Sequence, residues 1–264
     1  MNIGLIIIGD EILSGKRKDA HMPKVIELLS ARGLALSWAR YLGDDRERIT
    51  QALAQAFESG DLVFSCGGIG ATPDDHTRQS AAAALGVELA LHPQAKQLIE
   101  ERMQDVAREK GEPYEPDRPD NVHRLNMGVF PKGATIIPNP YNKIPGFSVG
   151  HVHFVPGFPV MAWPMIETLL DSTYGHLHGG HRLQERSIIV LGSMEATLTP
   201  LMEAIESEFA GIKVFSLPSV DHPQWGRHIE LGVKGKDSVD AAFAALKAGL
   251  VALGCKFGTE MVRP

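Results

Sequence analysis

A glycine-rich stretch followed by two adjacent carboxylates is the part of this sequence best suited to chemistry. Residues 66–77 read CGGIGATPDDHT, with glycines at positions 67, 68 and 70 and acids at Asp74 and Asp75. Glycine adopts positive φ angles and lets backbone N–H groups approach a ligand closely. A helix that begins near Asp74 would present its free N–H groups to the same space. This combination favours an anion such as a nucleotide diphosphate.

The two acids predict a cation beside that anion. Asp74 and Asp75 would repel a phosphate, whereas Mg²⁺ binds one or two carboxylates together with phosphate oxygens and water. Asp10, which ends the first apolar run, could also hold the metal or position the attacking water. Such a cation would neutralise the charge that develops at phosphorus. We therefore take Asp10, Asp74 and Asp75 as candidate catalytic residues. Asp74 and Asp75 are candidate ligands of Mg²⁺ or another divalent cation.

Each of these residues also has a purely structural interpretation. Asp74 or Asp75 could cap a helix without any metal, because aspartate is strongly preferred at that position. Asp10 could be a turn residue at the end of a strand. The glycine loop matches neither the Rossmann fingerprint nor the P-loop. Lys143 and Arg78 could be ordinary solvated charges.

The order of expected elements places the candidate loops at one edge of a sheet. Continuous aliphatic runs are typical of strands that are covered on both faces, and here they alternate with helical patterns. This alternation indicates right-handed βαβ crossovers and a three-layer α/β domain with a mostly parallel sheet. Ligands of such sheets bind beyond the carboxyl ends of the strands. The expected strands are 3–8, 35–42, 62–65, 134–137 and 152–155, and the expected helices include 74–85, 93–110 and 165–170, with one capped by Asp44 or Asp45 that runs to Glu58.

The remaining chain predicts a loop, a linker and a second domain. Residues 111–121 are rich in proline and acid, which is typical of a surface loop. Residues 173–185 are rich in glycine and histidine and read as a linker between domains 1–172 and 186–264. His176, His178 and His181 suggest a metal site, but structural zinc needs four ligands, so a solvated linker is favoured. The second domain is expected to be a small α+β fold with the order βαββα: strands 187–191, 212–217 and 228–233, a helix from Thr199 and a helix 238–253.

Composition excludes several functional classes. The chain has 264 residues, a formal net charge of −6 and a pI of about 6.0, so it lacks the basic surface typical of nucleic-acid binding. No run approaches the roughly 18 apolar residues of a membrane span. Two cysteines, Cys66 and Cys255, cannot form a disulfide framework. We therefore expect a cytoplasmic protein that binds neither nucleic acid nor membranes.

Four separated motifs resemble a known family. GDEILSG at residues 9–15, GGIGATPDDHT at 67–77, NPYNKIPGF at 139–147 and PGFPVMAWPM at 156–165 occur in the order found in the CinA family (competence/damage-inducible protein A). The resemblance is to its molybdopterin-binding-like domain and covers residues 1 to about 172. The wider superfamily includes molybdopterin adenylyltransferases and the corresponding domain of gephyrin. Residues 184–254 resemble the small middle domain of CinA proteins.

The resemblance implies a function and a set of site residues. It implies a metal-dependent pyrophosphatase that acts on ADP-ribose-like dinucleotides. Adenylyl transfer to molybdopterin and a non-catalytic nucleotide- or pterin-binding regulatory module are the alternatives. It also implies a homo-oligomer. The family usually has Gly-Thr-Ala-Pro-Gly where residues 142–146 read NKIPG, so Lys143 could contact phosphate or narrow the pocket. Besides the three acids, the expected ligand-binding residues are Gly9, Gly67, Gly68, Gly70, Thr72, Thr77, Lys143, Pro145, Gly146, Pro156, Gly157 and Pro159.

Overall fold

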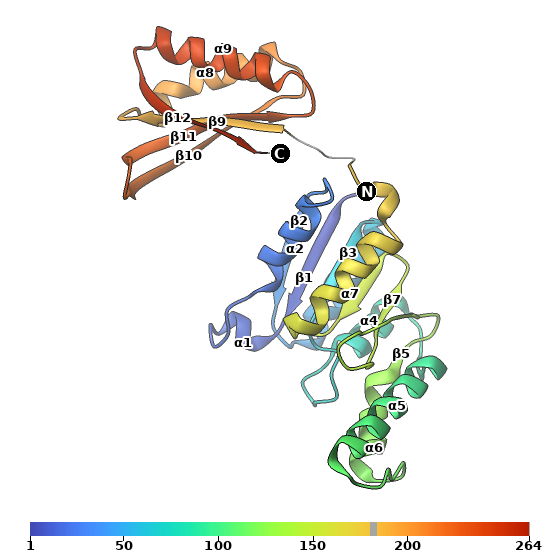
Figure 1. Ribbon diagram of the computed structural model, residues 1–264. Coiled ribbons are helices and arrows are strands. Elements are labelled where there is room, and N and C mark those ends of the chain that lie inside the picture. The colour runs from blue at the N-terminus through green and yellow to red at the C-terminus, as the bar shows by residue number, and fades with distance from the viewer. Residues whose placement is uncertain (180–183, 264) are drawn as a thin grey trace. The chain divides into compact units, whose positions relative to one another are not determined.

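The computed structural model describes residues 1–179 and 184–263, which form two compact units (Figure 1). The first unit comprises Met1–His178 and the second Gly179–Pro264. Each unit has its own sheet and its own hydrophobic core. Within the described ranges, no helix has the length and apolar character needed to cross a membrane.

The first unit is built on a six-stranded sheet with the order β2-β1-β3-β8-β7-β6. The first four strands in this order run parallel, and β7 and β6 join antiparallel. Every residue of β1 is buried, as expected for a central strand that is covered on both faces. The predicted mostly parallel sheet is confirmed. The strands are β1 (Ile3–Ile8), β2 (Trp38–Leu42), β3 (Leu62–Cys66), β6 (Thr135–Ile137), β7 (Gly146–Val149) and β8 (Val152–Val155).

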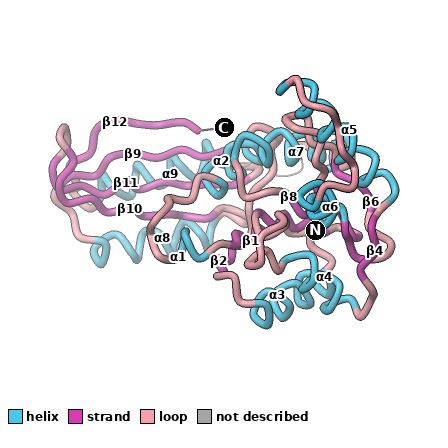
Figure 2. The backbone as a smooth tube through the Cα atoms, turned by 90° about the horizontal axis from the view of Figure 1, so that it is seen from below, coloured by secondary structure: helices cyan, strands magenta, loops and turns pink. Residues whose placement is uncertain are grey.

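Helices cover both faces of this sheet and complete the three predicted layers (Figure 2). On one face, α2 and α7 contribute Leu29 and Ile166 to the core, and on the other face α3 contributes Ile49 and Leu53. Asp45 caps α3 by accepting a hydrogen bond from the Arg48 amide at 2.8 Å, as the sequence predicts. The helices are α1 (Asp10–Leu13), α2 (His21–Ser30), α3 (Arg46–Ser59), α4 (Thr77–Leu85) and α7 (Pro159–Ser172).

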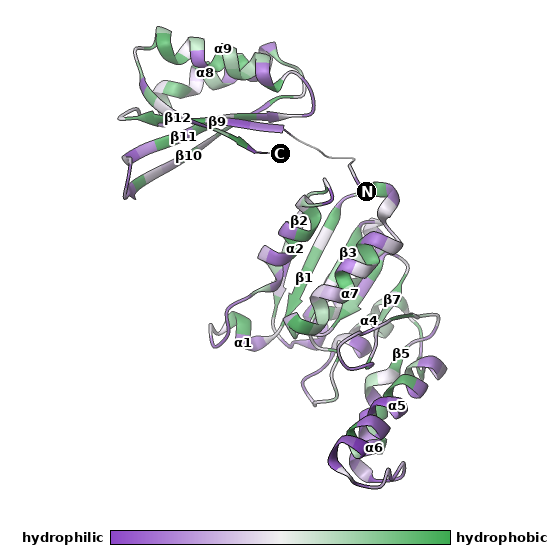
Figure 3. Ribbon diagram, in the orientation of Figure 1, coloured by the Kyte–Doolittle hydropathy of each residue, from purple (hydrophilic) through white to green (hydrophobic). Residues whose placement is uncertain are grey.

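A peripheral helical segment extends from this sheet and is mostly hydrophilic, in contrast to the apolar strands β1 and β3 (Figure 3). It includes the predicted long helix, α5, and a two-stranded antiparallel sheet that the sequence analysis did not predict. The predicted loop 111–121 is wrong at its end, because α6 begins at Pro119. Proline suits a first helical position, where no N–H is needed. The elements are β4 (Leu89–Leu91), α5 (Pro93–Lys110), α6 (Pro119–Arg124), the 3₁₀ turn η1 (Leu125–Gly128) and β5 (Val129–Pro131).

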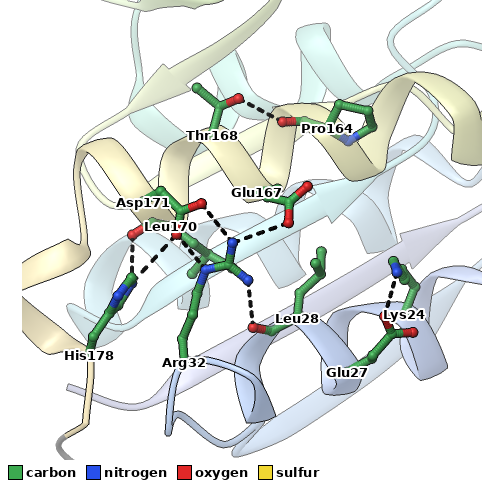
Figure 4. Close-up of polar contacts among 10 residues, drawn as sticks. All are labelled: Lys24, Glu27, Leu28, Arg32, Pro164, Glu167, Thr168, Leu170, Asp171 and His178. Carbon is green, nitrogen blue, oxygen red and sulfur yellow. Dashed lines mark hydrogen bonds and ion pairs between the residues drawn. The ribbon is translucent and has the colours of Figure 1, made fainter.

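A single guanidinium joins the end of α2 to α7 (Figure 4). Arg32 donates from Nε and Nη2 to the two oxygens of Asp171, at 2.5 and 2.7 Å, and from Nη2 to Glu167 at 3.2 Å. Its Nη1 also donates to the Leu28 carbonyl at 2.9 Å. Hydrogen bonding to Arg32 lowers the pKa of the Asp171 carboxyl. This bidentate pair links two helices that cover the same face of the sheet.

The second unit is a four-stranded antiparallel sheet, β10-β11-β9-β12, with α8 and α9 on one face (Figure 1). The predicted α+β class is confirmed, but the order βαββα lacks the final strand, β12. The helix predicted from Thr199 begins at Glu195 instead, and Pro200 lies inside it. The elements are β9 (Gln184–Leu191), α8 (Glu195–Glu208), β10 (Lys213–His222), β11 (Gly226–Gly235), α9 (Val239–Ala252) and β12 (Lys256–Arg263).

The predicted linker, residues 173–185, contains regular structure at both ends. A 3₁₀ turn, η2 (Gly175–Leu177), lies near its start, and β9 begins at Gln184. His178 Nε2 lies 3.0 Å from the Leu170 carbonyl oxygen, and His181 lies outside the described residues. Among residues 1–179 and 184–263, no three His, Cys, Asp or Glu side chains are grouped to hold a metal ion.

A buried polar chain links β7, β8 and the residues after α7. The His153 ring lies between the Ser148 hydroxyl, 2.7 Å from Nδ1, and the Tyr174 hydroxyl, 2.8 Å from Nε2. His153 is 3% exposed. Burial, with a smaller effect of His151, lowers the pKa of His153 to about 4. The ring is therefore neutral in the folded protein at neutral pH.

This histidine predicts a pH dependence of stability. Its pKa rises from about 4 in the folded chain to 6.5 on unfolding, so the unfolded chain binds the proton first as the pH falls. The free energy of unfolding should therefore lose about 3 kcal/mol between pH 6.5 and pH 4 through this group alone. Urea unfolding at several pH values should show that the free energy of unfolding depends less steeply on pH in His153→Gln than in the wild type. His176→Gln, which alters an exposed ring, should keep the wild-type slope; equal slopes in all three proteins would contradict this assignment.

Candidate functional site

The carboxyl ends of four parallel strands meet at one edge of the first sheet and border a cavity of about 390 Å³. This volume lies within the usual range of small-molecule sites. Gly9 follows β1, Asp44 follows β2, the glycines follow β3, and Pro156 and Gly157 follow β8; all of them line the cavity. The predicted loops therefore meet around a shared space.

Close contacts explain the first two glycines of the loop. A Cβ atom on Gly67 would lie 2.3 Å from the Ile8 carbonyl oxygen, and one on Gly68 would lie 2.2 Å from Thr77 Oγ1. Both residues also have positive φ angles, 105° and 67°. Thr77 donates from Oγ1 to the Gly67 carbonyl and from its amide to the Gly68 carbonyl, each at 3.0 Å. Thr77, the first residue of α4, therefore fixes the loop by hydrogen bonds and does not itself line the cavity.

The acidic pair lies in a turn and not in the helix. The helix predicted to begin near Asp74 starts at Thr77, because the Asp75 amide donates to the Thr72 carbonyl and closes a turn before it. Asp75 Oδ2 accepts from the Thr72 amide at 2.9 Å and from Thr72 Oγ1 at 2.5 Å. Asp75 Oδ1 takes no part in these bonds, and the Asp74 side chain is exposed. Both carboxylates line the cavity. Neither caps α4, because the N-cap residue is His76 and no side chain forms a capping hydrogen bond there.

Asp10 supports the site from outside the cavity. Its Oδ1 accepts a hydrogen bond from the Asp44 amide at 3.1 Å, and Asp44 Oδ2 accepts one from the Asp10 amide at 2.9 Å. Asp44 and Glu11 line the cavity, whereas Asp10 does not. The carboxylates of Asp44 and Glu11 thus lie in the cavity lining, where the sequence analysis expected that of Asp10.

The acids around the cavity repel one another. Burial raises the pKa of the Asp44 carboxyl, and the charges of Asp10, Glu11 and Asp74 raise it further. The hydrogen bond from the Asp10 amide opposes this increase without cancelling it. Arg17 is the single Lys or Arg side chain among the described residues that line the cavity. Negative charges therefore outnumber positive charges in the cavity lining, and a bound cation would offset this excess.

Three other expected residues do not line the cavity. Lys143 has a φ of 66° and its ammonium group pairs with Asp105 on α5 at 2.7 Å, so it neither contacts nor narrows the site. Gly146 belongs to β7, where a Cβ would lie 2.3 Å from the Phe154 carbonyl oxygen. Pro159 begins α7. The expected residues that do line the cavity are Gly9, Gly67, Gly68, Gly70, Thr72, Asp74, Asp75, Pro145, Pro156 and Gly157.

The sequence analysis missed an amide-rich and apolar side of the cavity. Asn139, which is 4% exposed, donates from Nδ2 to Asn142 Oδ1 at 2.8 Å and to the Ile144 carbonyl at 2.9 Å. These bonds fix the turn that was recognised as a motif but whose asparagines were not selected. The missed lining residues are Ile8, Glu11, Arg17, Asp44, Ile69, Met127, Asn139, Asn142, Ile144, Phe158 and Met161.

Cys66, next to the glycine loop, is not a reactive group. It ends β3, is 1% exposed, and burial raises the pKa of its thiol strongly. A thiol kept protonated in this way packs as a small apolar side chain and does not act as a nucleophile.

Comparisons with known proteins agree with this architecture. A family profile described as a probable molybdopterin binding domain matches residues 4–176. A CinA-like protein of Geotalea uraniireducens (strain Rf4) is 29% identical over 256 residues, covering 94% of this chain and 57% of the relative. A CinA-like protein of Citrifermentans bemidjiense is 31% identical over 221 residues, covering 81% of this chain and 50% of the relative. This chain therefore spans about half the length of these curated relatives.

A solved structure supports the same conclusion. The crystal structure of the protein CinA, of unknown function, from Thermoplasma acidophilum has a TM-score of 0.54 and 27% sequence identity to this chain. The match covers 65% of this chain and 98% of that one. The predicted resemblance is confirmed: the chain belongs to the family of the probable molybdopterin binding domain, and it is similar to CinA-like proteins.

Proposed function

We propose that the first unit hydrolyses the diphosphate linkage of an ADP-ribose-like dinucleotide with the help of a divalent cation. The observation that supports this most is the shared cavity, in which glycine backbone and several carboxylates lie together. Bare amides suit a phosphate group, whereas carboxylates suit a cation, and a nucleotide diphosphate with its metal ion presents both.

Separate parts of the cavity suit separate parts of such a substrate. The Gly67 amide donates to the Val155 carbonyl, so the loop would bind the diphosphate through the backbone N–H groups from Gly68 to Gly70. Arg17 would add a positive charge. Phe158 and Met161 offer apolar surface for a base or sugar. In this arrangement the loop orients the linkage that is to be broken, and the acids lie beside it.

The acids would divide the remaining work between them. Asp74, and Asp75 through its free Oδ1, would hold Mg²⁺, which when bound would neutralise charge on the phosphate oxygens. The described residues provide no cluster of three ligands, so phosphate oxygens and water would complete the coordination. Asp44 would accept the proton of the attacking water, since its raised pKa makes it a better base than an ordinary aspartate. Asp10 would position Asp44.

Adenylyl transfer to molybdopterin is the second candidate. The matched family is described as a probable molybdopterin binding domain, which favours a pterin ligand. Both reactions break a bond at the same kind of phosphorus, so the cavity suits either. A non-catalytic nucleotide- or pterin-binding module is the third candidate. Its main support, the unusual Lys143, is weakened because this side chain points to α5.

A product assay should separate these functions. With Mg²⁺ and ADP-ribose, the full chain should release AMP and ribose 5-phosphate, because the oxygen of water bonds to one phosphorus atom and the bond from that atom to the bridging oxygen breaks. Mass spectrometry of the products, with and without EDTA and with and without molybdopterin, is the measurement. AMP joined to the pterin would instead indicate adenylyl transfer. Ligand-dependent thermal stabilisation without any product would indicate a binding module.

A matched pair of variants should separate the proton acceptor from its support. Asp44→Asn should lower kcat by about 100-fold or more, because the amide cannot accept the proton of water. Asp10→Asn keeps an oxygen that can accept from the Asp44 amide, and should lower kcat by less than about 10-fold. Circular dichroism would confirm that both variants fold. Equal losses in the two variants would contradict the role given to Asp44.

A further inference from the structure

A second cavity, of about 360 Å³, adjoins the candidate site. It shares Thr72 and Asp75 with the first cavity, so the turn that contains them contributes to both. Its other polar lining comes from Arg78 and Gln79 on α4, His123 on α6 and Asn126 on η1. The proposed hydrolysis assigns no role to Arg78, Gln79, His123 or Asn126.

The buried guanidinium of Arg78 is the unusual feature of this cavity. Arg78 is 4% exposed, yet it takes part in none of the ion pairs within 4 Å among the described residues. Of its five N–H donors, one bonds within the described protein, from Nη2 to the Gly70 carbonyl, and its buried Nε has no partner. Burial lowers the pKa of Arg78, while the charge of Asp75 acts in the opposite direction. A buried charge with so few partners is costly unless an anion compensates it.

The surroundings of Arg78 contribute both polar groups and apolar side chains to the lining. His123 Nε2 lies 2.8 Å from the Ala71 carbonyl oxygen, and its Nδ1 lies 3.3 Å from the side-chain Nδ2 of Asn126. These two contacts fix the ring in the lining of the cavity. Leu89 and Val129 provide apolar lining. The volume exceeds what a bare phosphate needs, so the cavity suits a small molecule that carries an anionic group.

We propose that this second cavity binds a small molecule through a phosphate or carboxylate group held by Arg78. The ligand would satisfy the guanidinium donors that the protein leaves free. Arg78 also holds the carbonyl of Gly70, a residue of the glycine loop, so the bound anion and the first cavity share one side chain. The second cavity is therefore a separate anion site whose ligand can affect the glycine loop.

Nuclear magnetic resonance of the ¹⁵N-labelled full chain can locate such an anion. Inorganic phosphate, ribose 5-phosphate and succinate would be titrated separately, without nucleotide or metal. Saturable shifts should occur in the amide signals of Leu89, Asn126 and Val129, which report on the second cavity. A response to both phosphate compounds but not to succinate would identify a phosphate ligand, and the reverse would identify a carboxylate. Because the readout needs no turnover, it is independent of the proposed hydrolysis.

Variants provide the control. Arg78→Gln should weaken the binding of the responding anion by at least about 10-fold, the loss expected when one charged hydrogen-bonding partner is removed. Arg124→Gln removes an equal charge on α6 from a residue that does not line the cavity, and should leave affinity unchanged. If Arg78→Gln does not fold, Arg78→Lys should fold and bind more weakly, because lysine lacks the forked donors. Shifts confined to Gly67 and Gly68, no shifts at all, or equal affinity in the glutamine variants would overturn the proposal.

Discussion

The contact between Gly67 and the last residue of β1 is the constraint on which the candidate site depends. A side chain on Gly67 would overlap the Ile8 carbonyl, so two neighbouring strand ends come this close only because glycine lies between them. A Cβ on Gly157, after β8, would also touch Gly67, at 3.4 Å. Three loops thus meet on one glycine, and the cavity is the space that they enclose.

Charges of opposite sign are distributed around the turn at Thr72. Carboxylates gather on the side of the first cavity, where burial and, to a smaller extent, neighbouring negative charges raise the pKa of Asp44. A guanidinium with few partners lies on the side of the second cavity. The glycine loop is hydrogen-bonded to the start of α4, through Thr77 and through Arg78. A cation bound in the first cavity and an anion bound in the second would each offset the electrostatic cost of charges that the folded chain leaves uncompensated.

Much of the fold could be predicted because local patterns dictate it: buried strands give aliphatic runs, and glycines mark loops that must pass close to other backbone. The position of Asp44 could not be predicted, since it depends on β2 pairing beside β1, a contact distant in sequence. Lys143 was assigned to the site from its motif, but its ammonium group pairs with Asp105 on α5, a contact distant in sequence. The strands β4 and β5 have three residues each, too few for a recognisable alternation.

The two cysteines differ in a way that makes the chain convenient to study. Cys66 is sealed in the core beneath the glycine loop, and its thiol stays protonated. Cys255, which follows α9 in the second unit, is partly exposed. A maleimide dye should therefore attach to Cys255 and spare Cys66, which would give a fluorescent reporter on the second unit without any engineered substitution.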